Sequence, residues 1–208
     1  STRAEVDSLL EAGDIDGLRE RFGQSLSFGT AGLRGVLGAG PNRMNRQVVI
    51  RITAGLVRHL EHTVSDLRDR GVVVGRDGRH GSEAFARDVA EVLAGAGVPV
   101  WILDGVVATP LVGFAVLDHR AAAGVMITAS HNPPEYNGYK VYGADGAQIV
   151  TPHDEAISRA AGQIESLASV PRLELEQAVS EGLVRVLGGE LTERYFRAIA
   201  SVVGTPSV

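Results

Sequence analysis

The residues Gly71-Val72-Val73-Val74-Gly75 form a run too short and too rich in β-branched side chains for a helix, and they predict a strand buried on both faces of a sheet. A polar turn, Arg76-Asp77-Gly78-Arg79, follows at once. Upstream, apolar residues recur at helical spacing between residues 45 and 60, and downstream a helix is expected to begin at Ser82 and to close at Gly97. Helices and short buried strands that alternate in this way indicate a layered α/β domain.

Further strands fit the same pattern. Apolar runs predict buried strands at 98–103 and at 124–127, with a short helix at 109–117 between them. A fourth strand at 139–142 is reached by a connection too short to hold a crossover helix, so it should run antiparallel. Residues 151–154 resemble a capping box for the next helix. We predict a three-layer α/β/α domain with a mixed, mostly parallel four-stranded sheet whose last strand is antiparallel.

The two ends of the chain depart from this pattern. Residues 1–22 are acidic and weakly helical, with Asp14 as a helix cap, and the glycine-rich residues 28–41 indicate a sharply turning loop. Residues 183–187 resemble an edge strand, and 191–203 a last helix. The expected division is an amino-terminal helical segment at 1–27, the main domain at 28–187 and the start of a second, truncated domain at 188–208.

Composition excludes several classes of protein. The chain has 208 residues, 44% of them hydrophobic, and a formal net charge of -5, which argues against duplex nucleic acid as the main partner. It has no cysteine, so disulfides, thiolate catalysis and thiolate-bound zinc are excluded. No apolar run approaches the roughly 20 residues of a membrane span, and the start lacks the order of a signal peptide. We therefore expect a cytoplasmic protein with no membrane partner.

Ser130 is the first candidate for chemistry. It lies in a polar loop directly after the strand at 124–127, at the sheet edge where ligands of open α/β sheets bind. His131 is adjacent in sequence, but a serine hydroxyl is a weak nucleophile without a base or a bound charge to assist it. The flanks are not the Gly-x-Ser-x-Gly elbow of the hydrolases. On composition alone, a turn serine that satisfies loop amides is the competing interpretation.

Two cations accompany this loop. Lys140 is the only lysine in the chain, and a lysine in a partly desolvated, positively charged site can serve as acid or base, whereas arginine cannot. The alternative is that Lys140 has no functional role and is present on its strand by chance. Arg34 lies in the glycine-rich loop, where its guanidinium and the backbone N–H groups could cradle a phosphate. The loop matches neither the P-loop nor the dinucleotide fingerprint, which argues against nucleotide binding.

His59 and His62 form a separate histidine pair at helical i, i+3 spacing, which could hold a metal ion. With no third ligand evident from the sequence, we interpret them as surface residues.

Several motifs together carry a family resemblance. Thr128-Ala129-Ser130-His131-Asn132-Pro133, followed by Tyr136-Asn137-Gly138-Tyr139-Lys140, resembles the phosphoserine loop of the α-D-phosphohexomutases, the phosphoglucomutase and phosphomannomutase family. Phe28-Gly29-Thr30-Ala31-Gly32-Leu33-Arg34-Gly35 is similar to the amino-terminal motif of that family, and residues 75–79 to its next loop. The motifs occur in the family order, and the resemblance spans residues 28–157.

The resemblance implies the first domain of a four-domain enzyme. Ser130 would carry a phosphoryl group and bind Mg²⁺ through it, together with three aspartates of a loop that this sequence does not contain. Lys140 and His131 match positions near the proton transfers, and Arg34 matches one near the phosphoserine. The substrate-binding residues that the resemblance implies are Thr30, Arg34, Ser130, His131, Asn132 and Lys140. The isolated chain should therefore show no turnover.

The implied activity is a phosphosugar mutase that interconverts hexose 1-phosphate and hexose 6-phosphate, of glucose or mannose, through a bisphosphate intermediate. Glucose 1,6-bisphosphate or an equivalent would be the activator, and the remaining mutase domains the partners. The 28–35 motif resembles the branch with phosphopentomutases and long phosphoglucomutases, so pentose phosphates stay open as substrates, as does the oligomeric state. The alternative is a non-catalytic phosphosugar-binding or regulatory domain with Ser130 as a phosphorylation switch. A serine hydrolase is the third hypothesis.

Overall fold

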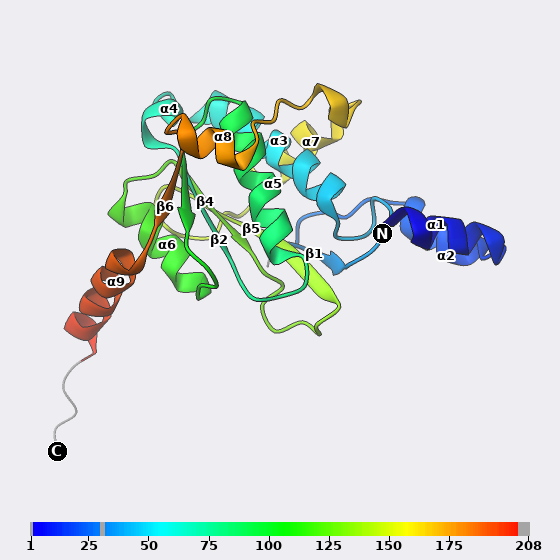
Figure 1. The fold of residues 1–208 in the computed structure, drawn as a ribbon, viewed down its shortest axis with the longest axis horizontal. Helices are drawn as coiled ribbons and strands as arrows, with labels where there is room; N and C mark the ends of the chain where they lie inside the picture. The colour runs from blue at the N-terminus through cyan, green and yellow to red at the C-terminus, as the bar shows by residue number, and fades with distance from the viewer. Residues whose placement is uncertain (1, 30–31, 204–208) are drawn as a thin grey trace, which may run out of the picture.

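A computed structural model describes residues 2–29 and 32–203, and its core is one mixed sheet between helices (Figure 1). The strands are β1 (Leu33–Val36), β2 (Val72–Arg76), β3 (Val100–Leu103), β4 (Ala123–Ile127), β5 (Tyr136–Tyr142) and β6 (Val184–Leu187). The helices are α1 (Thr2–Glu11), α2 (Ile15–Phe22), α3 (Arg46–Thr63), α4 (Leu67–Arg70), α5 (Ser82–Gly95), α6 (Thr109–Asp118), α7 (His153–Gly162), α8 (Leu175–Ser180) and α9 (Gly189–Val202), with the 3₁₀ turn η1 (Leu167–Ser169).

The sheet has the order β1-β5-β4-β2-β3-β6. Strands β4, β2, β3 and β6 run parallel to one another, whereas β5 runs antiparallel to both of its neighbours, β4 and β1. The α/β/α class, the mostly parallel sheet and the antiparallel direction of β5 are confirmed.

The predicted count of four strands is wrong, because the sheet has six. Strand β6 lies in the predicted edge-strand segment and joins the sheet beside β3. Strand β1 was missed, because it lies inside the glycine-rich stretch that we interpreted as a loop. Gly35 in this strand leaves room for Leu26, whose side chain would lie 2.8 Å from an added Cβ, and Leu33 is fully buried. Strand β1 forms by backbone pairing with β5 at the edge of the sheet, so it shows little alternation of apolar residues.

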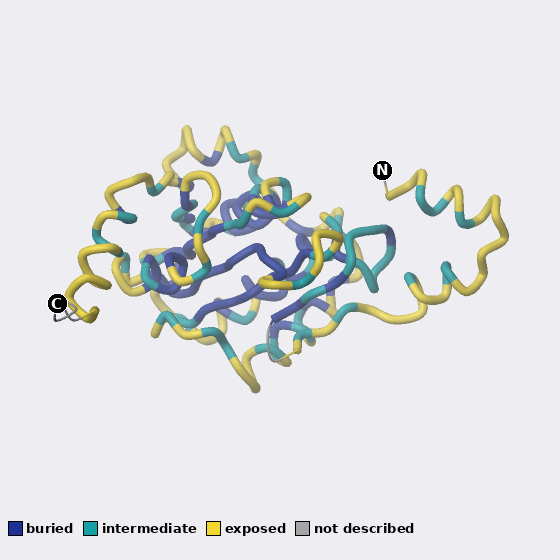
Figure 2. The backbone as a smooth tube through the Cα atoms, turned by 90° about the horizontal axis from the view of Figure 1, so that it is seen from below, coloured by how far each residue is buried: buried dark blue, intermediate teal, exposed yellow. Residues whose placement is uncertain are grey.

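Two apolar clusters cover the two faces of the sheet. The buried stretches of the chain lie at the centre of the molecule, and the exposed ones at its edges (Figure 2). On one face α3, α5 and α7 pack against alternate residues of the central strands, such as Val72, Val74 and Val125. On the other face α6 packs against the residues between them, such as Val73 and Met126, and the start of α9 adds Leu191 to the same cluster. Full burial of strand residues on both faces is what the unbroken valine run predicted.

Two predicted caps had different outcomes. Asp14 is the N-cap of α2, and its carboxylate accepts a hydrogen bond of 2.8 Å from the Gly17 N–H, as expected. The capping box at residues 151–154 is wrong: the N-cap of α7 is Pro152, and the Thr151 hydroxyl donates to the Asp154 carboxylate instead of accepting from the backbone. The N-cap residue of α7 makes no side-chain hydrogen bond to the first turn, as expected of a proline.

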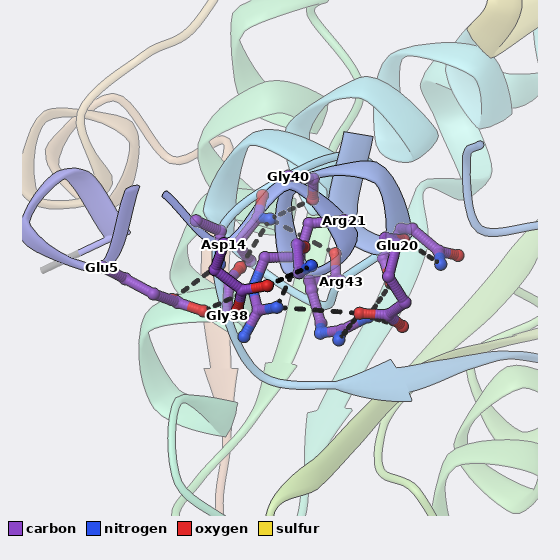
Figure 3. A network of polar contacts seen from close by, with 11 residues as sticks. Glu5, Asp14, Glu20, Arg21, Gly38, Gly40 and Arg43 are labelled. Atoms are coloured by element: carbon purple, nitrogen blue, oxygen red, sulfur yellow. Dashed lines mark hydrogen bonds and ion pairs between the residues drawn. The ribbon is translucent and has the colours of Figure 1, made fainter. Parts of the chain in front are cut away.

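The helices α1 and α2 extend from the body, and polar contacts attach them to the turn after β1 (Figures 1 and 3). The Glu5 carboxylate accepts a hydrogen bond of 2.9 Å from the Arg21 Nε and another of 2.9 Å from the Ala39 N–H. Glu20 forms an ion pair with Arg43. Neither helix has a buried residue, so these contacts, rather than a shared core, fix the segment.

Asn45 connects this turn to α3, since its side chain caps the helix and also ties down the preceding loop. The Asn45 Oδ1 accepts from the Val48 N–H at 3.0 Å, while the Nδ2 donates to the carbonyls of Gly38 and Gly40, each at 2.9 Å, and of Arg43 at 3.2 Å. The Asn45 side-chain amide therefore hydrogen-bonds both to a free N–H in the first turn of α3 and to backbone carbonyls of the glycine-containing turn before it.

We expect Asn45→Asp to lower the free energy of unfolding by about 1–3 kcal/mol, although aspartate caps helices as well as asparagine does. The variant keeps the cap acceptor but loses the donor and sets a negative charge beside carbonyl oxygens. Asp14→Asn, the equivalent exchange at the α2 cap, is the control and should change stability by less than about 0.5 kcal/mol. Urea unfolding measures both, and equal stability of Asn45→Asp and the unmodified protein would contradict the double role.

Candidate active site

The loop that joins β4 to β5 carries Ser130 at the carboxyl end of β4. Ser130 has a φ of 60°, in the left-handed region that non-glycine residues seldom adopt. Its N–H donates to the Thr128 Oγ1 at 2.9 Å, which holds this conformation. The residue is exposed, whereas Ala129 before it is fully buried. A strained backbone with an exposed hydroxyl at this sheet edge is typical of a functional position.

Arg79 holds the serine loop in place from the neighbouring strand end. Its Nη1 donates to the carbonyls of Pro133 at 2.9 Å and Tyr136 at 3.2 Å, and its Nη2 donates to those of Ser130 at 2.8 Å and Asn132 at 2.7 Å.

The Asp77 carboxylate fixes the guanidinium in turn. An ion pair of 3.1 Å joins the Asp77 Oδ2 to the Arg79 Nε, and the Ser82 hydroxyl donates to the Asp77 Oδ1 at 2.7 Å. The planar guanidinium of Arg79 thus joins the turn after β2 to four backbone carbonyls of the loop that carries Ser130.

His131 lies beside the serine hydroxyl. Its Nδ1 is 3.4 Å from the Ser130 Oγ, at the long end of hydrogen-bond distances. Both residues are exposed, and Ser130 lines an open pocket of about 380 Å³. The pocket is lined by Asp77, Gly78, Arg79, His80, Ser130, Asn132 and Pro134.

Arg34 reaches the loop from the β1–β5 side, and Lys140 lies beside Arg34 on β5. Arg34 is opposite Gly138 in the antiparallel register, so Arg34 and Lys140 are diagonal neighbours on one face of the sheet. The Arg34 Nη1 donates to the Asn132 Oδ1 at 3.1 Å, two residues after Ser130. The Arg34 Nε is buried and has no hydrogen-bond partner among the described residues, so this cation retains an unused donor.

Close backbone contacts bring these strands together. A Cβ on Gly138 would lie 2.6 Å from the Leu33 carbonyl oxygen and 2.7 Å from that of Thr128. Gly32 has a φ of 92°, and a Cβ there would lie 2.8 Å from the Tyr139 carbonyl oxygen. Only glycine fits at both places, so the glycines of the motifs set the approach of Arg34 and Lys140 to the loop.

Lys140 is the titratable cation of the group. Only 9% of the surface of Lys140 is exposed to solvent. Burial, and secondly the positive charge of Arg34, lower the pKa of the Lys140 amine below its ordinary value. An amine with a lowered pKa exchanges its proton more readily near neutral pH, as a proton-transfer group requires.

The structure thus brings Arg34, Ser130, His131, Asn132 and Lys140 together around one loop. Thr30, the remaining predicted substrate-binding residue, lies outside the described residues. The sequence analysis missed Arg79 as the residue that holds the loop. Its place in the polar turn after β2 was visible, but the four carbonyls it binds could not be known before the loop was placed.

Magnesium needs several oxygen ligands, and the described part of the chain has no group of three or more metal-ligating side chains. Ser130 contributes one oxygen. These residues do not form a magnesium site on their own. Within residues 2–29 and 32–203, the structure also has no helix long and apolar enough to cross a membrane.

Comparison with known proteins identifies the family. Residues 25–168 match the model of phosphoglucomutase/phosphomannomutase, alpha/beta/alpha domain I. The chain therefore belongs to the phosphoglucomutase/phosphomannomutase family, and the resemblance stated from the motifs is confirmed.

Individual relatives agree. A phosphopentomutase of Mus musculus is 46% identical over 165 residues, which are 76% of this chain and 27% of that protein. A phosphoglucomutase of Staphylococcus saprophyticus is 38% identical over 180 residues, 86% of this chain and 32% of that protein. A crystal structure of a phosphoglucomutase/phosphomannomutase family protein from Burkholderia thailandensis superposes with a TM-score of 0.60 at 25% identity, covering 81% of this chain and 34% of that one. The chain thus spans about a third or less of the relatives it matches.

We expect Arg79→Lys to loosen the serine loop, because an ammonium group cannot bind the carbonyls as a planar fork does. The loss of about 2 kcal/mol of hydrogen bonding corresponds to roughly thirty-fold faster amide exchange in residues 128–138. Arg76→Lys, in the same turn, is the control and should leave exchange unchanged. Hydrogen exchange measured by mass spectrometry tests this, and equal exchange in both variants would contradict the role of Arg79.

We expect the Lys140 amine to titrate below the ordinary lysine value of about 10.4. With one lysine in the chain, a ¹³C-lysine label gives a single, unambiguous NMR signal. Since the folded pKa is lowered, the charged amine opposes folding at neutral pH, and this penalty is relieved as pH rises from the lowered value toward the unfolded one. Arg34→Gln should raise the Lys140 pKa, and an ordinary value in the unmodified protein would contradict the site's electrostatics.

Proposed function

We propose that this chain is the phosphoserine domain of a phosphosugar mutase, with Ser130 as the phosphoryl carrier. The proposal depends on the conformation and position of Ser130. Its φ is positive, its residue is exposed, and Arg79 holds its loop at the carboxyl edge of the sheet. The family to which the chain belongs supports it.

In the proposed reaction a hydroxyl oxygen of a sugar monophosphate attacks the phosphorus on the Ser130 Oγ. The new sugar O–P bond forms, the Oγ–P bond breaks, and the sugar hydroxyl gives up its proton. Lys140, with its lowered pKa, and His131, 3.4 Å from the Oγ, are the proposed groups for that proton and for its return. The reverse transfer from the other position of the bisphosphate restores phosphoserine.

Positive charge around the loop supports phosphoryl transfer, in which positioning and charge stabilisation supply most of the catalysis. Arg34 donates to Asn132, and its guanidinium brings positive charge to the loop. Thr30, Arg34 and Asn132 are the proposed substrate-binding residues of this chain, with Ser130, His131 and Lys140. The Mg²⁺ remains part of the proposal, with a phosphoserine oxygen as the ligand from this chain and the aspartates outside the given sequence.

The proposed substrates are hexose phosphates of glucose or mannose. The names of the relatives, phosphopentomutase and phosphoglucomutase, keep pentose phosphates as the competing class. Glucose 1,6-bisphosphate is the proposed activator, and a cytoplasmic location and the remaining mutase domains are part of the same proposal. On this view residues 188–208 begin the second domain, and residues 1–27 form a separate helical segment before the first.

We expect glucose 1,6-bisphosphate to phosphorylate Ser130 in the full-length protein, because that hydroxyl is the exposed and positioned one. Tandem mass spectrometry localises the phosphate. Ser130→Ala should abolish the modification and lower the mutase turnover at least 1,000-fold, as expected when a nucleophile is removed.

Ser169→Ala, at another exposed serine, is the control and should keep both. The isolated 208-residue chain should show no turnover. Phosphate on a serine other than Ser130 would favour the regulatory alternative, and an unphosphorylated full-length protein would defeat the mechanism.

A further inference from the structure

A pair of histidines joins α3 to α7, outside the serine loop. The Nε2 of His59, in the last turns of α3, lies 3.1 Å from the Nδ1 of His153, the first residue of α7. The rings meet edge to face, with centroids 5.2 Å apart and planes at 73°. Ninety-four positions separate the two residues, so the spacing of the sequence could not reveal the pair.

The distance between the two nitrogen atoms suits a shared metal ion. Two nitrogen ligands at about 2.0–2.1 Å from a tetrahedral zinc ion lie roughly 3.3–3.4 Å apart. The observed separation of 3.1 Å is close to this value. A small rotation of the exposed His153 ring therefore lets both lone pairs converge on one ion in place of the shared proton.

Helix packing holds the two side chains in register. At Gly55, one turn before His59, a Cβ would lie 2.7 Å from the Ile157 carbonyl oxygen, so the backbones of α3 and α7 touch. The His153 N–H donates to the Val150 carbonyl at 3.0 Å, which fixes the start of α7. Ligands on rigid, packed elements lose little freedom when a metal binds.

The protonation state favours a metal ligand, which must be a neutral imidazole. Burial lowers the pKa of His59, and the charges of His153 and His62 lower it further. The Nδ1 of His62 lies 2.6 Å from the Arg58 carbonyl oxygen, one turn back on α3, so this ring nitrogen is engaged with the backbone.

We propose that His59 and His153 form a binding site for a divalent transition metal of the zinc class, with water at the remaining positions. Imidazole nitrogen suits zinc and its neighbours, whereas Mg²⁺ prefers oxygen. The described residues provide no third histidine, aspartate or glutamate to close the site, so it keeps open positions. Because α3 leads into the amino end of β2, the pair lies toward the sheet edge opposite Ser130, and the proposal does not depend on the mutase reaction.

The test is calorimetric titration of the full chain with Zn²⁺, beside ¹³C NMR of labelled histidine rings. We expect one zinc ion per chain, with ring signals of His59 and His153 shifting together. His59→Gln and His153→Gln should each weaken binding at least tenfold. His62→Gln, on the same helix surface, is the matched control and should change the affinity by less than twofold.

Several results would overturn the proposal. These are no heat and no ring shift with excess Zn²⁺, an equal loss in His62→Gln, or the same response to Mg²⁺, which would mean general attraction of cations. Urea unfolding without metal checks that the exposed substitutions leave the fold intact. Should either variant fail to fold, the ring shifts of the unmodified protein decide, since only the signals of His59 and His153 should move.

Discussion

The backbone pairing of β5 with β4 on one side and β1 on the other is the constraint on which the site depends. Strand β5 can run antiparallel only if the chain reverses directly after β4, and this reversal creates the serine loop. The same pairing sets Arg34 opposite Gly138 and Lys140 opposite Met126. The positions of Ser130, Arg34 and Lys140 therefore all follow from the register of β5, and a slip by one residue would send Lys140 to the other face.

The serine loop combines rigidity with exposure. Loop carbonyls normally turn to water, but here Arg79 satisfies four of them, and Asp77 holds the guanidinium in its plane. The hydroxyl of Ser130 stays outside this bonding scheme, apart from the long contact with His131. The protein thus fixes the backbone of the loop and leaves the Ser130 hydroxyl free to meet a ligand.

The sequence predicted what depends on local patterns and missed what depends on long-range contacts. The buried valines of β2, the helical stripe of α3 and the reversal before β5 were readable, because periodicity and connection length determine them. Strand β1 was not, since Leu33 and Arg34 become a strand only against β5. The candidate residues came from motif and residue type, whereas the loop-holding role of Arg79 and the pairing of His59 with a residue 94 positions away exist only in three dimensions.

The amino-terminal arm of α1 and α2 has a different physical character from the rest of the molecule. It is attached to the rest of the chain by the Glu5 carboxylate on the Ala39 N–H, by the ion pair of Glu20 with Arg43 and by the Asn42 N–H on the Arg21 carbonyl, and neither helix contributes a buried side chain. Salt weakens exposed ion pairs and charge-assisted hydrogen bonds of this kind, whereas it does not screen apolar burial. The arm is therefore held by polar contacts that depend on ionic strength, whereas the sheet is held by apolar burial.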